Sequence, residues 1–139
     1  MFLTNNLNKA ELGKKFANKY YKKRYNCAQS VLLATSKAMK INISKDLVRS
    51  AKVFSGGIGM SGCLCGALAG AILFIGNNYS GSEKKAKEFT ELFKKEFGST
   101  CCRVLKKDLD YKDSKLQKQC LKLTENTTRL LIEFIEGAI

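Results

Sequence analysis

The chemistry that this sequence offers depends on its cysteines. They are Cys27, Cys63, Cys65, Cys101, Cys102 and Cys120. The chain contains no histidine, which excludes Ser/His/Asp triads, Cys/His dyads and every zinc site with a histidine ligand. It also contains no Cys-x-x-Cys pair, so the thioredoxin and zinc-ribbon signatures are absent. The chemistry that remains is that of thiolates.

Three of the cysteines lie where a helix is expected to begin. Cys27 follows Asn26, a good N-cap residue. Cys65 precedes a Gly/Ala-rich helix, and Cys102 follows the chain break at residues 97–100. The unpaired amides and the dipole at a helix start stabilise a thiolate. These three positions therefore favour reactive or metal-binding thiols.

Cys120 differs, because it lies on the apolar stripe of the last expected helix. Any one cysteine by itself is best explained as a small buried hydrophobic residue. Three at helix starts, together with one that faces inward, instead favour a site where Cys27, Cys65, Cys102 and Cys120 converge.

A glycine cluster precedes Cys65. Residues 57–62 match the pattern G-x-G-x-x-G. A dinucleotide-binding fold would need a strand before these glycines, whereas the sequence before them is helical. We therefore interpret the cluster as a turn that enters a helix. Such a turn lets backbone amides approach a bound anion, a cluster or a thiolate.

The elements that must position these residues are helices. Helical periodicity marks five segments: residues 9–23, 26–39, a third from Ser44, a fourth from Ser82, and 114–136. Between the third and fourth, Gly62, Gly66 and Gly70 recur every four residues, as they would on a helix face that another backbone approaches closely. We predict an all-α, compact, single-domain bundle (1–139) of about five or six helices with a central Gly/Ala-rich helix.

The formal charge of +13 comes mostly from lysine, and only four basic residues are arginines. The lysines are spread over nearly every helical segment, so we interpret them as solvated surface rather than as a nucleic-acid interface. No apolar stretch reaches the length of a membrane span, and residues 1–6 do not begin a signal peptide. We expect a cytoplasmic protein, in a reducing compartment where cysteines bind metals or react more often than they form structural disulfides.

The string Cys65-Gly66-Ala67-Leu68-Ala69-Gly70 matches a CGAxxG motif. With it the chain resembles the C_GCAxxG_C_C family, small redox-active proteins with four characteristic cysteines. The resemblance covers nearly the whole chain: residues 26–29 resemble the region of the family's first cysteine, and residues 56–60 its glycine run. Cys102 and Cys120 resemble its third and fourth cysteines. Cys63 and Cys101 are extra to the pattern.

The leading hypothesis is a thiol redox protein. In it Cys65 attacks a disulfide, Cys27 or Cys102 resolves the mixed disulfide, and Cys120 is the buried fourth member. The alternative is a zinc or [2Fe–2S] site with ligands Cys27, Cys65, Cys102 and Cys120. No sequence feature separates the two.

Two further hypotheses stay open: a basic nucleic-acid-binding module, which is disfavoured, and a plain helical interaction module. The expected partner is a redox protein or a small thiol. Whether the chain is an enzyme, as a thiol–disulfide oxidoreductase, and whether it forms a homodimer are both left open by the sequence.

Overall fold

The computed structural model describes residues 8–105 and 114–137, and in these residues helices alternate with short loops and no strand occurs. The all-α prediction is therefore confirmed, whereas the prediction of one domain over residues 1–139 stays a prediction. The elements are α2 (Lys9–Lys22), α3 (Cys27–Met39), α4 (Lys45–Ser50), the 3-10 helix η1 (Ala51–Phe54), α5 (Gly66–Asn78), α6 (Ser82–Phe97), α7 (Cys102–Leu105) and α8 (Ser114–Ile135).

The expected helix starts and ends agree with these bounds to within a few residues. Ser44 caps α4, because its hydroxyl oxygen accepts a hydrogen bond of 3.0 Å from the amide of Leu47. The third expected helix is not continuous, however. It tightens at Ala51 into the 3-10 helix η1.

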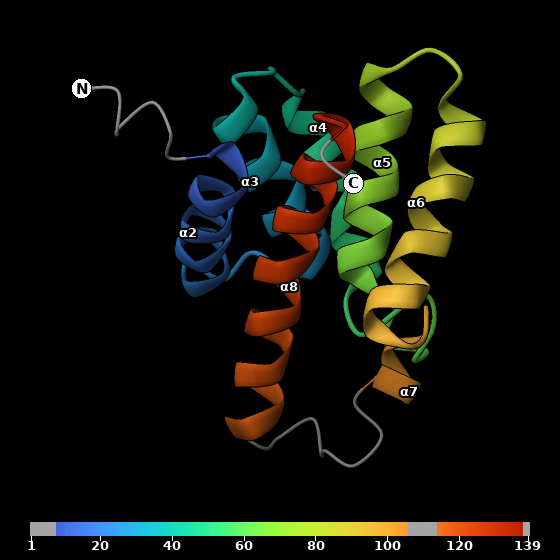
Figure 1. Cartoon of the computed structure of the whole chain (residues 1–139). Helices are drawn as coiled ribbons and strands as arrows, with labels where there is room; N and C mark the ends of the chain where they lie inside the picture. The colour runs from blue at the N-terminus through green and yellow to red at the C-terminus, as the bar shows by residue number, and fades with distance from the viewer. Residues whose placement is uncertain (1–7, 106–113, 138–139) are drawn as a thin grey trace.

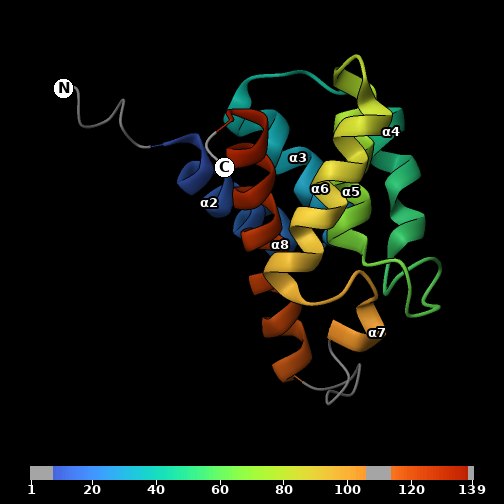
Figure 2. The ribbon, with the colours of Figure 1, turned by 45° about the vertical axis from the view of Figure 1, so that its right-hand side comes forward.

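The long helices lie side by side in a bundle (Figure 1). Helix α2 packs against α8 and α3, and α3 in turn packs against α5. Helix α5 also contacts α6 and α8, so the predicted central position of the Gly/Ala-rich helix is confirmed. Figure 1 shows α6 on the outer side of α5, and the turned view in Figure 2 shows α7 beyond the end of α6.

Helix α5 lies at the centre because small residues let a neighbouring backbone come close. A Cβ on Gly70 would lie only 2.9 Å from Cα of Ala28 in α3 and would collide with the carbonyl oxygen of the same residue. A Cβ on Gly66 would collide with the carbonyl oxygen of Phe54. Gly62 does not belong to this face, because the helix begins only at Gly66.

Larger apolar side chains fill the other side of α5. Phe74 of α5 and Phe89 and Phe93 of α6 are fully buried. The ring of Phe89 packs edge-on against Phe134 of α8, with centroids 5.5 Å apart. This aromatic contact packs α6 against α8.

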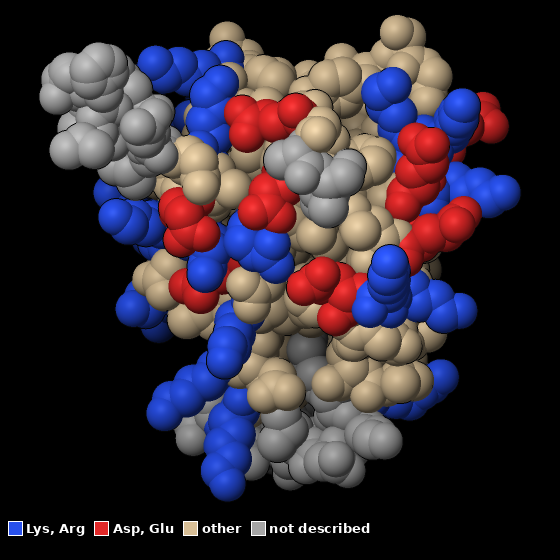
Figure 3. Space-filling view, in the orientation of Figure 1, with Lys and Arg blue, Asp and Glu red and all other residues tan. Residues whose placement is uncertain are grey.

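Basic side chains are spread over the face shown in Figure 3, with acidic side chains between them. This distribution agrees with the interpretation of the charge as solvated surface on that face. The nucleic-acid alternative itself stays untested. Among the described helices, none combines the length and the apolarity needed to cross a membrane.

Candidate functional site

The segment between η1 and α5 is a tight loop of positive-φ residues. Gly57 has φ of +93°, and a Cβ there would lie 2.9 Å from backbone atoms of Gly62. The amide of Gly62 donates a hydrogen bond of 2.9 Å to the carbonyl of Gly56 within the segment, and the amide of Gly59 donates one of 2.7 Å back to the carbonyl of Val53 in η1. The glycines therefore fold the loop on itself. The sequence analysis suggested that such amides could approach a bound anion, a cluster or a thiolate. These two amides instead donate to backbone carbonyls of the chain itself.

A disulfide ties this loop to the start of α7. Cys63 and Cys101 are bonded, with Cα atoms 4.4 Å apart and a sequence separation of 38. Two backbone hydrogen bonds lie beside the disulfide: Cys65 N donates to Thr100 O, and Arg103 N to Gly62 O, each at 2.8 Å. Together they fix the start of α5 against the start of α7.

Sequence reasoning set Cys63 and Cys101 apart as extra residues and missed that they pair. A signal was present, because Cys63 is two residues before Cys65 and Cys101 is directly before Cys102. Once Cys65 and Cys102 are expected to converge, their neighbours must lie close as well.

Cys27 is the first residue of α3, and its position is set by a capping box. Asn26 accepts a hydrogen bond of 2.9 Å from the amide of Gln29, whose side chain accepts one of 3.1 Å from the amide of Asn26. The side chain of Asn26 also donates to the carbonyl of Lys52 at 3.0 Å. The predicted N-cap is confirmed, and it anchors the start of α3 to η1.

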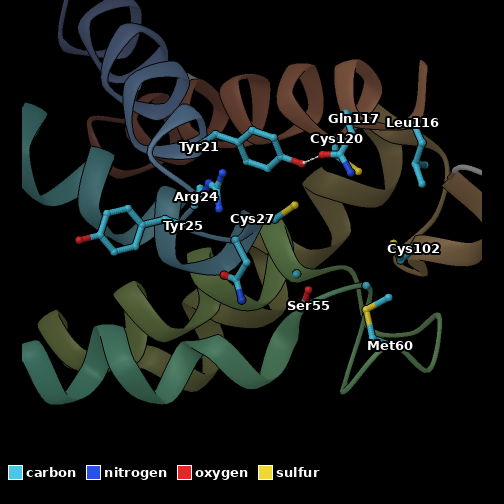
Figure 4. A pocket seen from close by; sticks show the side chains of 13 residues that line it. Tyr21, Arg24, Tyr25, Cys27, Ser55, Met60, Cys102, Leu116, Gln117 and Cys120 are labelled. Carbon is cyan, nitrogen blue, oxygen red and sulfur yellow. Dashed lines mark hydrogen bonds between the residues drawn. The ribbon is translucent and has the colours of Figure 1, made fainter. Parts of the chain in front are cut away.

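A cavity of about 390 Å³ lies where these helix starts meet. Three of the four predicted site residues line it: Cys27, Cys102 and Cys120 (Figure 4). The fourth, Cys65, is the N-cap residue of α5 and directly precedes Gly66, which also lines the cavity. The other lining residues are Tyr21, Arg24, Tyr25, Asn26, Ser55, Gly56, Met60, Leu116 and Gln117.

The four cysteines differ in access to solvent. Cys65 is 1% exposed and Cys102 is 2% exposed. Cys27 and Cys120 are half-buried. The Cβ of Cys27 lies 3.4 Å from the position that a Cβ on Gly66 would occupy, so Cys27 packs against the first turn of α5. The accessible thiols are therefore those of α3 and α8.

Polar residues that the sequence analysis did not single out complete the cavity wall. The hydroxyl of Tyr21 in α2 donates a hydrogen bond of 3.0 Å to the side-chain oxygen of Gln117 in α8. Figure 4 shows this contact between the two helices, with Arg24 on the side of Cys27. No short sequence pattern joins Tyr21 to Gln117, because 96 positions separate them.

The zinc and [2Fe–2S] hypotheses require several ligands around one point. Within residues 8–105 and 114–137, no three or more side chains of the types His, Cys, Asp and Glu form a group that would hold a metal ion. As arranged here, the thiols surround a cavity but do not form such a ligand set. The zinc and [2Fe–2S] hypotheses stay predictions.

Comparison with known proteins identifies a match to one protein family. Residues 25–134 match the family model described as "Putative redox-active protein (C_GCAxxG_C_C)". A protein of Archaeoglobus fulgidus, named "Uncharacterized protein", is 36% identical over 66 residues, which are 48% of this chain and 44% of that protein. The similarity thus spans less than half of that relative. No solved structure matches the chain.

Proposed function

This chain belongs to the C_GCAxxG_C_C family of redox-active proteins, and we propose that it carries out thiol–disulfide exchange in the cavity lined by Cys27, Cys102 and Cys120. One observation carries the proposal. Cysteines from three separate helices, α3, α7 and α8, line a single cavity, and the N-cap residue of α5 supplies a fourth beside it. Core-filling cysteines have no reason to gather in this way.

Burial favours Cys27 as the attacking thiol. A reactive cysteine needs access to its substrate and an environment that stabilises the thiolate. Cys27 is half-buried and begins a helix of 13 residues, so it meets both conditions. Cys65, which sequence reasoning favoured, begins a helix too but is 1% exposed. In this proposal Cys65 supports the site and Cys27 meets the substrate.

The exchange proceeds in two steps. The Cys27 thiolate attacks one sulfur of the substrate disulfide, an S–S bond forms between them, and the other half of the substrate leaves as a thiolate. Cys102 or Cys120 then attacks the Cys27 sulfur, and the second half of the substrate leaves as a thiolate. The substrate gains two electrons and the protein dithiol becomes a disulfide. In a reducing compartment such as the cytoplasm, a small thiol or a dithiol protein reverses this change.

Trapping the mixed disulfide tests the proposal. We expect wild-type protein treated with a small neutral disulfide to form a transient adduct at Cys27, located by peptide mass mapping. A Cys102→Ser or Cys120→Ser variant should make that adduct persist, and the variant that does so identifies the resolving thiol. Cys27→Ser should remove the fast adduct, while a Cys63→Ser/Cys101→Ser variant should keep it.

The adduct rates measured on the same samples can also overturn the proposal. Adduct formation that is no faster at Cys27 than at a cysteine of the denatured protein overturns it. Near-stoichiometric zinc or iron in anaerobically purified protein, lost together with the Cys27 thiol, would support the metal-site alternative instead.

A further inference from the structure

We propose that Arg24 recognises a negative charge on the substrate, so that the cavity accepts small disulfides that carry a carboxylate. The inference rests on the proposed exchange at Cys27 and adds to it the chemical class of the substrate. Three observations carry it: the backbone conformation of Arg24, the composition of the cavity lining, and the size of the cavity.

Arg24 occupies a backbone position that usually belongs to glycine. It directly follows Lys23, the C-cap residue of α2, and its φ is +76°. Residues with a Cβ rarely adopt this left-handed conformation, and helices commonly place glycine there. The arginine therefore has no local folding advantage over glycine. Its side chain needs another explanation, and the cavity that it lines provides one.

Arg24 is the one lysine or arginine among the described residues that line the cavity, and no aspartate or glutamate lines it. Arg24 is exposed and forms no ion pair with the described part of the chain. Its guanidinium lies on the same side of the cavity as Cys27 (Figure 4). A positive group thus lines the same cavity as the proposed attacking thiol, and no carboxylate of residues 8–105 or 114–137 forms an ion pair with it.

A guanidinium binds a carboxylate through two parallel hydrogen bonds, which fix orientation as well as add affinity. The cavity volume of about 390 Å³ is within the range of small-molecule sites. A carboxylate bound by Arg24 would hold the remainder of a small disulfide over Cys27. The Cys27 thiolate then forms the new S–S bond, and the departing half leaves as a thiolate that carries its own charge.

The test compares two disulfide probes on the native protein. Dithiobis(nitrobenzoate) carries two carboxylates, and dithiodipyridine is neutral at neutral pH. A positive charge near Cys27 raises the fraction of thiolate, which speeds the reaction with both probes alike, whereas attraction or binding of the carboxylate changes the ratio of the two rates. A control variant at a distant lysine separates binding at Arg24 from the attraction due to net charge. We expect Arg24→Gly to lower the anionic-to-neutral rate ratio at Cys27 about five- to tenfold.

Lys40→Gly is the matched control. Lys40 also has a left-handed backbone, with φ of +56°, is also exposed, and its loss changes the net charge equally. Lys40 is the C-cap residue that follows Met39 at the end of α3, and Cys27 is the first residue of the same helix. About 20 Å of helix therefore separates Lys40 from the cavity. We expect its rate ratio to stay within about twofold of wild type, since its charge acts only through the general field.

The outcomes separate the inference from the function on which it rests. If Cys27 reacts with neither probe in wild-type protein, the proposed exchange is wrong. If Cys27 reacts with both probes and Arg24→Gly leaves the ratio unchanged, the exchange stands and the role of Arg24 is wrong. A ratio that falls equally in both variants also overturns that role, because net charge alone then explains the preference. Glycine suits the left-handed position, so unfolding of the Arg24→Gly variant is not expected.

Discussion

Helices α3 and α5 meet in two places, at glycines one turn of α5 apart, and the two places differ in what lies beside them. At Ala28 and Gly70 the backbones touch, and not even a methyl group fits between them. At Cys27 and Gly66 the same two helices border a cavity of about 390 Å³. A single helix pair therefore provides both a closed packing contact and one wall of the proposed reactive site.

The difference arises from what covers each place. The Ala28–Gly70 contact lies inside the bundle, where helices alone meet. The Cys27–Gly66 place is at the end of the bundle, where the glycine loop, α7 and α8 form the opposite wall. Close helix contact needs only small residues, whereas the cavity needs several segments to be held around an empty space. Changes at the two places should therefore have different consequences for stability and for thiol chemistry.

The largest expected effect comes from the disulfide that holds the cavity end. A Cys63→Ser/Cys101→Ser variant should lose about 4 kcal/mol of unfolding free energy, because the bond closes a long loop in the unfolded chain. Chemical denaturation measures the loss. Wild-type protein in strong reductant is the control and should match the variant. A loss below about 1 kcal/mol would contradict this loop-closure account of the bond's contribution to stability.

The packed contact should respond through stability alone. Gly70→Leu is expected to cost about 1–3 kcal/mol, because the new side chain overpacks the backbone of Ala28. Thermal unfolding measures the cost. Gly76→Leu, in the same helix, is the matched control: nothing lies within 4 Å of its Cβ position, so no loss is expected. An unchanged melting temperature for Gly70→Leu would refute the close-packing argument.

The smallest expected loss of stability comes from the cap of α3, and this change should also affect the thiol chemistry at Cys27. Asn26→Ala removes the cap of α3 and should cost about 1 kcal/mol of unfolding free energy. Because Cys27 is the next residue, its adduct rate with a neutral disulfide should fall as well. Ser44→Ala removes the cap of α4 and provides the control. It should show a similar stability loss with an unchanged adduct rate; equal rate losses in both variants would indicate a general loosening.

Much of the fold could be predicted because its signals are local. Asn26 and Ser44 cap helices through contacts with residues three positions away, so the sequence alone reveals both helix starts. Gly66 and Gly70 are four residues apart, and this spacing alone puts them on one helix face. The loss of regular α-helix at Ala51 was missed, since no proline or glycine marks it.

The site could be predicted only in part. Sequence reasoning named Cys27 and Cys102 from their places at helix starts, Cys120 from its place on an apolar helix stripe, and all three from the resemblance to a family. The assignment of Cys65 as the attacking thiol stays a prediction, and the burial that bears on it depends on how α5 packs. Arg24 escaped notice because one arginine in a basic sequence carries no signal until its neighbours in space are known.

The long helices, the caps at Asn26 and Ser44 and the Gly66–Gly70 face of α5 follow from the sequence alone, because each depends on residues within about one turn of each other. Three features depend instead on the packing of the whole chain: Cys63 pairs with Cys101, Tyr21 meets Gln117, and three thiols share one cavity. Those contacts join residues dozens of positions apart. They form only when packing of the whole bundle has brought the helix ends together, since no short stretch of the chain specifies them.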